Sequence, residues 1–282
     1  MKIYKILGTS IIAVSLLGCE TSISSTHTQK QDSTKNQQTQ QDQNSQSAEH
    51  SPNGDSSGSE HNSTGSLNEQ TPPRTEQEVL KQLGGQLKTK VPFIIPKNVP
   101  LAEGKYLTAT TTSEMWYYQI KLYETDQPAA INSQAAANGK LIASVEGTEY
   151  KDEVNAQKAI NGYVKADISQ NSIDLGPGIK GTEDAGAGHS YVIWNEGRWS
   201  IKVDSPNDPT YKNKQYPDGV ELAKKIVTYL HDHTLPAPQK IGVITIRNWQ
   251  KEPQTTIQWQ DHKITYQITS SDPMTALEIV VH

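Results

Sequence analysis

His189 and its neighbours are the residues of this sequence whose types come closest to nucleophilic chemistry. Ser190 follows the histidine directly and acidic residues precede it, and these are the residue types of a serine hydrolase triad. A nucleophilic serine needs a sharp turn such as G-x-S-x-G, and residues 188–192 lack the second glycine. The sequence therefore does not favour catalysis here, and we expect a protein with no catalytic residues.

Possible metal ligands occur in two other places. His231 and His233 would offer two imidazoles, but residues two apart on a helix point about 200° away from each other, and a histidine is favourable at a helix C-terminus without any metal. Residues 204–218 lack the spacing and the final glutamate of a calcium loop. A segment rich in Asp, Asn and Pro more often forms a turn. Its side chains that could offer oxygen ligands are Asp204, Asn207, Asp208 and Asp218. We expect no metal site.

A glycine pattern in residues 176–181 matches the dinucleotide fingerprint G-x-G-x-x-G. That fingerprint needs a preceding strand and a following helix whose N-terminus receives the pyrophosphate. Residues 182–188 cannot form such a helix, so we expect a loop and no cofactor. Because glycine reaches conformations that other residues cannot, this stretch would also suit a mobile flap.

Four aromatic residues are the candidates for contact with a ligand. Tyr117, Tyr123, Trp249 and Trp259 would line a groove for a glycan or a peptide, because exposed aromatic rings stack on the apolar faces of sugars. The alternative is that these rings pack in the core, which is the default for large aromatic side chains.

The first elements that must position these residues lie between residues 75 and 124. A cap-like threonine and apolar residues at helical spacing predict a helix over residues 75–87, interrupted at Gly84 and Gly85. Prolines keep the extended segment 91–96 out of the middle of a sheet. Residues 105–112 and 115–124 alternate as strands.

The remaining elements mix strands with two helices. Strands are predicted over residues 140–145, 163–168 and 172–175, and a short helix over residues 152–160. Residues 190–194 and 198–203 alternate around a glycine-containing turn at 195–197, which predicts a hairpin. A longer amphipathic helix follows over residues 218–233, and the prolines after it end it.

An internal similarity suggests how these elements combine. Residues 194–205 align without gaps on residues 259–270, and 223–227 match 276–280 after a loop difference. We predict an α+β fold in which an antiparallel sheet is built from repeated hairpin–helix units, with the helices packed on one face. Chance similarity between two amphipathic hairpins is the alternative. The globular domain is predicted over residues 74–282, with a possible subdomain boundary near residue 235.

Charge and cysteine content exclude several classes of partner and chemistry. The formal net charge is −5, so no basic field attracts nucleic acid, and we expect no nucleic-acid partner. Cys19 is the single cysteine of the chain, which excludes an intrachain disulfide framework.

The N-terminus reads as an export and anchoring signal. Lys2 and Lys5 precede an apolar run, residues 6–17, that is too short for the roughly 20 residues of a membrane-spanning helix. The run ends in Leu16-Leu17-Gly18-Cys19, which resembles the lipobox of bacterial lipoproteins. By that resemblance, residues 1–18 are a cleaved signal peptide and Cys19 carries a diacylglyceryl group. The protein would then be held by this lipid at the outer face of the cell membrane.

The segment that follows would connect the anchor to the folded domain. Residues 19–73 are rich in Ser, Thr, Gln and Asn and contain hardly a large apolar residue beyond Ile23 and Leu67. Such a segment cannot bury enough apolar surface to offset its conformational entropy, so we predict a disordered tether.

Residues 90–282, with a tryptophan-bearing hairpin followed by an alanine-containing helix, resemble the extracytoplasmic domains of uncharacterised lipoproteins from Bacillus and its relatives. More distantly, they resemble the half-barrel envelope domains of lipoprotein carriers and anti-sigma-factor partners. The resemblance implies a Gram-positive envelope protein. Its motifs are structural, and no binding residue carries over.

Three functions remain open at this point. The favoured hypothesis is a non-catalytic binding, scaffolding or sensing domain that meets an envelope protein, a peptide or a glycan. A hydrolase of envelope polymers is the alternative from another class. A carrier of an apolar ligand would instead need a cavity, and the candidates to line it are Trp116, Ile120, Trp194 and Ile268. The sequence indicates no oligomeric state.

Overall fold

Alternating apolar and polar residues build most of this protein as β-strands. The computed structural model describes residues 72–281. Its strands are β1 (Tyr106–Glu114), β2 (Tyr117–Thr125), β3 (Lys140–Glu149), β4 (Ser172–Gly176), β5 (Ile179–Gly186), β6 (His189–Glu196), β7 (Trp199–Pro206), β8 (Gly242–Arg247), β9 (Gln254–Asp261) and β10 (Ile264–Ser270). The helices are α1 (Glu76–Gln86), α2 (Gln134–Ala137), α3 (Glu153–Ala159), α4 (Gly219–Asp232) and α5 (Pro273–Val280), with a 3₁₀ turn η1 (Pro209–Tyr211).

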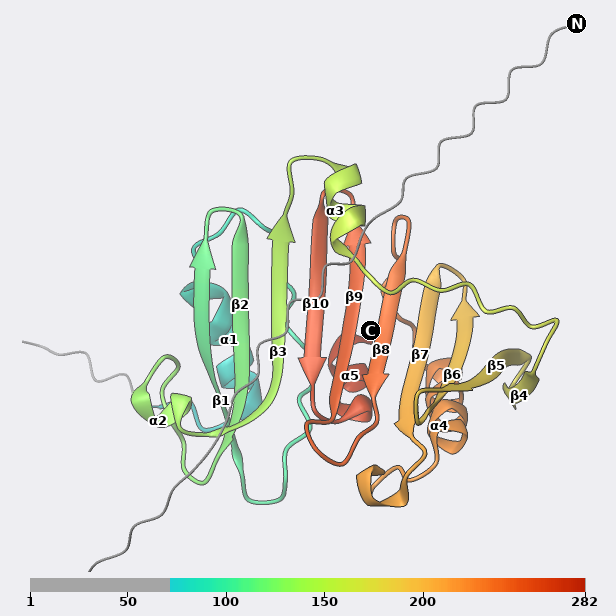
Figure 1. Cartoon of the computed structure of the whole chain (residues 1–282). Coiled ribbons are helices and arrows are strands. Elements are labelled where there is room, and N and C mark those ends of the chain that lie inside the picture. The colour runs from blue at the N-terminus through green and yellow to red at the C-terminus, as the bar shows by residue number, and fades with distance from the viewer. Residues whose placement is uncertain (1–71, 282) are drawn as a thin grey trace, which may run out of the picture. The chain divides into compact units, whose positions relative to one another are not determined.

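The strands form one continuous sheet, in the order β1-β2-β3-β10-β9-β8-β7-β6-β5-β4 (Figure 1). Its named strand pairs are antiparallel except for β7 and β8, which run parallel. A parallel pair needs a long crossover connection, and α4 lies in the chain between these two strands. Residue 235 falls within that crossover, and the sheet continues on both sides of it.

The predicted α+β fold, with repeated hairpin–helix units and helices packed on one face, is wrong. Strands make up 38% and helices 22% of the described residues, so the fold is mainly a mixed, largely antiparallel sheet. Helices also touch both sides of it: α1, α4 and α5 contact one face, while α2 and α3 lie on the other. The internal similarity reports only the local periodicity of two hairpins. It contains no information on how β7 joins β8.

The two hairpins themselves have matching turns. In β6–β7, Glu196 pairs with Trp199 and Gly197 has a φ of 58°. In β9–β10, Asp261 pairs with Ile264 and His262 has a φ of 51°. Positive φ at the start of a two-residue turn matches the twist of the flanking strands. The hairpin predicted within residues 190–203 is therefore confirmed, with its turn at 197–198.

Strand periodicity gives the sheet two chemically different faces. On one face, side chains such as Ile120, Ile244 and Ile268 are fully buried beneath α1, α4 and α5. Burial of apolar area stabilises the fold by about 25 cal/mol per Å², so this layer holds the sheet together. The other face, which we call the open face, is mostly polar and partly exposed; it includes Gln119, Lys121, Ser144, Glu146, Gln267, Thr269, Gln258, Thr256, Thr245 and Lys202.

The helix predictions at 75–87, 152–160 and 218–233 are confirmed as α1, α3 and α4. Gly84 and Gly85 do not interrupt α1, which continues to Gln86 because its apolar face packs in the core. Helix α4 begins at its N-cap Asp218, whose carboxylate accepts from Val220 N at 2.8 Å.

The predicted strand at 163–168 is wrong. This segment is extended but joins no strand, and it crosses the end of the open face instead. Its backbone bonds to side chains: Val164 N donates to Ser200 Oγ at 3.0 Å and Ala166 N donates to Asn195 Oδ1 at 2.8 Å. Side chains of the sheet therefore satisfy the backbone groups that a neighbouring strand would otherwise satisfy.

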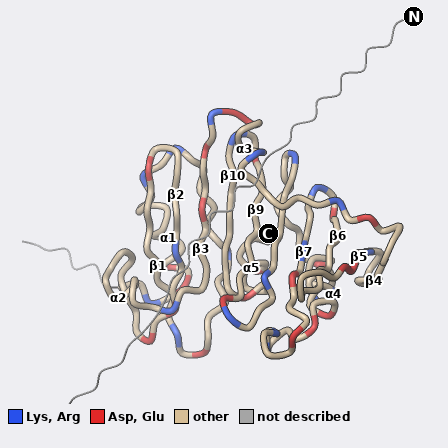
Figure 2. The backbone as a smooth tube through the Cα atoms, in the orientation of Figure 1, with Lys and Arg blue, Asp and Glu red and all other residues tan. Residues whose placement is uncertain are grey.

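The predicted signal peptide, the lipid site Cys19 and most of the tether lie outside the described residues. Within residues 72–281, no helix is both long enough and apolar enough to cross a membrane. Charged residues of both signs are interspersed over the described chain, many of them at turns and strand ends (Figure 2).

Candidate functional site

The structure separates the four aromatic candidates. Trp259 is 3% exposed and packs between Trp199 and Tyr266, with ring centres 6.3 and 5.3 Å away. Tyr117 and Tyr123 are half-buried on β2, and burial raises the pKa of Tyr117, helped by Glu146. Strands β3, β10 and β9 separate β2 from β8, so Trp249, which follows β8, is not their neighbour. Trp249 lines a pocket together with the rings of His189 and Tyr211.

That pocket, which we call the aromatic pocket, has a volume of about 360 Å³. It lies where β6 begins and where the chain leaves β7 and β8. Tyr211 is its most prominent exposed ring, with 58% of its surface accessible. The residues that line it come from three separate stretches of the chain: Gly188, His189, Pro206, Asp208, Tyr211, Trp249 and Lys251.

Rings of this pocket contact further rings and cations beside it. The ring centres of His189 and Trp249 are 5.1 Å apart, and His189 stacks on Tyr191 at 6.2 Å. The guanidinium of Arg247 lies 4.9 Å from the Trp249 ring centre, and Lys202 Nζ lies 4.2 Å from that of Tyr191. Cation–π contacts of this kind stabilise the positions of the Tyr191 and Trp249 rings.

Backbone contacts fix the segments that carry these rings. Gln250 N donates to Tyr211 O at 2.8 Å, and Lys212 forms an isolated bridge with Trp249. Asn248 is buried, and its amide donates to Tyr216 O at 2.7 Å. The Trp249 ring is therefore held by the residues on either side of it. Its Nε1 is shielded from solvent and has no hydrogen-bond partner among the described residues, which is unusual for a buried donor.

The histidine of this site is not part of a hydrolase triad. His189 and Ser190 are successive strand residues, so their side chains point to opposite faces of the sheet. The partner of His189 is Asp204, with 2.6 Å between Nδ1 and Oδ1. This pair crosses from β6 to β7 and was not foreseen from the sequence, where the two residues are 15 positions apart. The pair orients the imidazole but contacts no serine.

Each acid that suggested a calcium loop has another role. The Asp208 carboxylate accepts from Thr210 N and Oγ1 at 2.8 and 2.7 Å, and these bonds lower the pKa of Asp208. Asp218 caps α4, and Asp204 holds His189. Within residues 72–281, no cluster of His, Cys, Asp and Glu is arranged to hold a metal ion.

The other motifs are also explained by the fold. His233 stacks on Tyr229 with ring centres 4.0 Å apart, at the end of α4. The pattern at 176–181 is the tight β4–β5 hairpin rather than a phosphate loop or a loose flap. Gly181 is required there because a Cβ would come within 2.7 Å of Leu175 and 2.9 Å of Ile193 O.

The four residues proposed to line an apolar cavity do not share one. Ile120, Trp194 and Ile268 are fully buried in the continuous core, whereas Trp116 is 47% exposed at the β1–β2 turn. The core that fills this space leaves the carrier hypothesis without support.

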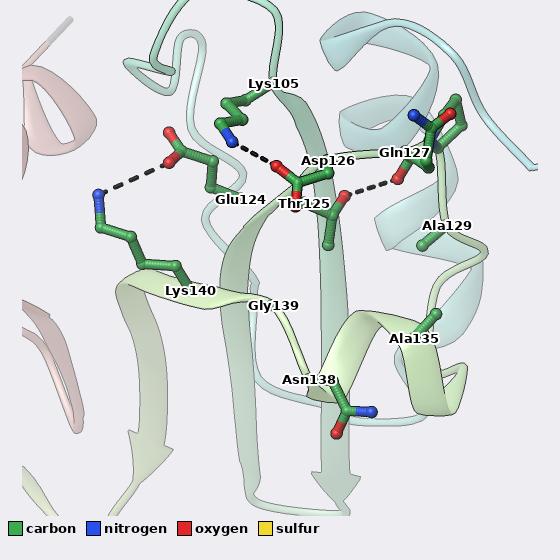
Figure 3. Close-up of a pocket in the computed structure, with 11 residues that line it drawn as sticks. Lys105, Glu124, Thr125, Asp126, Gln127, Ala129, Ala135, Asn138, Gly139 and Lys140 are labelled. Carbon is green, nitrogen blue, oxygen red and sulfur yellow. Dashed lines mark hydrogen bonds and ion pairs between the residues drawn. The ribbon is translucent and has the colours of Figure 1, made fainter.

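A larger depression of about 510 Å³, the corner pocket, lies beside β1, β2 and the start of β3 (Figure 3). Its charged residues pair with each other: Lys105 with Asp126, and Lys140 with Glu124 at 3.6 Å. Glu124 also accepts from Ala102 N at 2.9 Å. The walls of this pocket satisfy their own charges.

The aromatic pocket thus offers stacking surfaces, cations and an oriented imidazole, and it lacks a nucleophile placed beside a base. Such an arrangement can bind a ring-shaped ligand with polar edges. No protein-family model matches this chain, and neither a curated protein nor a solved structure is significantly similar to it.

Proposed function

We propose that this protein is a lipid-anchored envelope protein whose folded domain binds a glycan without catalysis. The observation that supports binding is the aromatic pocket, where His189, Tyr211 and Trp249 surround a space of about 360 Å³. The anchor is proposed from the resemblance of residues 16–19 to a lipobox.

A glycan fits this pocket better than a peptide for two reasons. Aromatic rings present flat apolar surfaces to the C–H faces of a sugar, while its hydroxyls remain free to bond at the rim. The open face beside the pocket carries many hydroxyl and amide side chains, among them Thr245, Thr256 and Gln254. These groups can exchange hydrogen bonds with sugar hydroxyls at little cost.

Binding is tested with the full chain and soluble glycan fragments released from bacterial cell walls. Titration followed by NMR or calorimetry is expected to show saturable binding that Tyr211→Ala weakens about tenfold, the loss of about 1.4 kcal/mol of stacking. Tyr163→Ala is the matched control, because Tyr163 is a similarly exposed tyrosine at 41% that lies outside the pocket. Equal losses in both variants, or no binding by the wild type, would reject the proposal.

The anchor is tested separately by Cys19→Ser. The wild-type chain is expected in the membrane fraction with a diacylglyceryl adduct on Cys19, and the variant is expected in the medium or soluble fraction without it. Mass spectrometry of the N-terminal peptide and cell fractionation measure both. An unmodified wild-type Cys19 contradicts the anchor and leaves the binding proposal standing.

A further inference from the structure

Arg247 lines a second depression on the open face and contacts Trp249 of the aromatic pocket. It is half-buried at the end of β8, and its guanidinium stacks on Trp249. The same side chain lines a neighbouring pocket of about 350 Å³, which we call the hydroxyl pocket because Ser144, Thr269 and Ser271 contribute to its wall. Arg247 therefore lines the hydroxyl pocket and contacts one ring, Trp249, of the aromatic pocket.

Within residues 72–281, the guanidinium of Arg247 forms no ion pair. Glu252, the acid that lines the hydroxyl pocket, is not within ion-pair distance of it. An arginine presents a planar fork of N–H donors that matches carboxylates and phosphates, and half-buried forks are normally engaged. Arg247 is thus the available anion-binding group of this region.

Two acids lie near Arg247 or the aromatic pocket, and each is bonded to another residue; Asp204 stands opposite Arg247 in the β7–β8 pairing. Asp204 is bonded to His189, and Asp208 is bonded to Thr210. Lys251 also lines the pocket and forms no ion pair among residues 72–281. Asp208 and Glu252 bring negative charge to the same two pockets, so the planar fork of Arg247, and not an excess of positive charge, is the feature that selects an anionic group here.

We propose that Arg247 binds the acidic group of an anionic saccharide that spans both pockets. This inference rests on the proposed function and adds the charge and the extent of the ligand. One sugar ring lies against Tyr211 and Trp249, its carboxylate or phosphate meets the Arg247 fork, and the next unit exchanges hydrogen bonds with Ser144 and Thr269. An extended acidic oligosaccharide satisfies all three features at once.

The test compares charged and uncharged forms of the same oligosaccharide, using the full chain. One arm uses a uronic-acid trisaccharide and its methyl ester, and the other uses a sugar-phosphate oligomer and its dephosphorylated form, which distinguishes the two sources of charge.

Arg247→Gln is expected to weaken binding of at least one acidic form by tenfold or more, and to change binding of the matched neutral form less than about twofold. Arg198→Gln is the matched control, because Arg198 is an exposed arginine whose Nη1 bonds to Gln239 O at 3.1 Å, outside both pockets. Arg247→Lys is expected to restore only part of the affinity, since it keeps the charge and loses the fork.

The outcomes separate this inference from the proposed function. If Tyr211→Ala weakens binding but Arg247→Gln does not, the acidic saccharide is wrong and glycan binding stands. If neither substitution changes affinity, or no saccharide binds, both proposals fail. If hexaglutamate binds as tightly as the acidic saccharide with the same dependence on Arg247, the saccharide class is rejected in favour of an acidic peptide.

Discussion

The corner pocket and the aromatic pocket both lie along ends of the strands, and they differ in what their walls leave unsatisfied. The corner pocket is the larger, yet Lys105, Asp126, Lys140 and Glu124 neutralise one another within it. In the aromatic pocket the Trp249 ring stacks on Arg247 from the neighbouring hydroxyl pocket, and neither Arg247 nor Lys251 forms an ion pair within residues 72–281. By volume alone, the corner pocket would be the better candidate for a binding site. The aromatic pocket is the better candidate by its chemistry, because its rings and nearby cations remain available to a ligand. We infer that the corner pocket has a structural role and that the aromatic pocket binds the ligand.

Among the substitutions that test the difference between the two pockets, Gly139→Ala in the corner pocket is expected to lower the free energy of unfolding the most. A Cβ at Gly139 would lie 2.9 Å from Glu124 O and 2.9 Å from Thr125 Cγ2, so the chain must shift to admit it. Overpacking of this kind costs about 1–3 kcal/mol of unfolding free energy. Urea denaturation measures the loss, and saccharide affinity is expected to stay unchanged.

Gly186→Ala is the control for that substitution, because a Cβ there meets no atom within 4 Å and its φ is not in the left-handed region. It is expected to alter unfolding free energy by less than about 0.5 kcal/mol. A loss of ligand binding in Gly139→Ala with unchanged stability would reverse the roles that we assign to the two pockets.

A smaller effect on stability is expected at the aromatic pocket. Tyr211 is 58% exposed, so Tyr211→Ala is expected to change unfolding free energy by no more than about 0.5 kcal/mol while it weakens binding. Urea denaturation and titration of the same preparation measure both quantities. A large stability loss without a change in affinity would make the ring a structural residue.

The smallest effect is expected from pH. The ion pair with Lys105 lowers the pKa of Asp126. Because the folded pKa lies below the unfolded value, the pair stabilises the fold at pH above the unfolded pKa, and this stabilisation is lost as pH falls through the folded pKa. The pair is exposed to solvent, so its contribution is small. An NMR titration of Asp126 is expected to show a higher pKa in Lys105→Met than in the wild type. An identical pKa in the two proteins would show that the pair does not form in solution.

Local features of the sequence predicted the individual elements well. The cap-like Thr75 and the apolar periodicity of three segments located α1, α3 and α4, and alternation located β1, β2 and the β6–β7 hairpin. The segment 163–168 has the alternation of a strand but bonds to side chains, which periodicity cannot show. Strands β5 and β8 were missed, the first because its glycines and acids resemble a loop.

The candidate site was only partly predictable. Trp249 was recognised as a possible ligand contact from its residue type, but Tyr211, Arg247 and the pair His189–Asp204 were not. His189 and Asp204 meet across the β6–β7 hairpin, beyond the residues over which that hairpin was predicted. Tyr211 and Arg247 come near each other because β7 and β8 run side by side, which is a long-range property of the chain. A signal was present in the sequence, since aromatic and basic residues follow both strands, yet nothing local says that the two strands are neighbours.

The parallel alignment of β7 and β8 has a consequence for how the ligand specificity of this protein can evolve. Both strands deliver their carboxyl ends to the same rim, so the segments at 207–217 and 248–253 share one small patch while the sheet beneath them keeps its register. Substitutions in these two segments could change which ligand the patch binds without any change in the sheet. Proteins related to this chain that bind different ligands are therefore expected to differ mainly within residues 207–217 and 248–253.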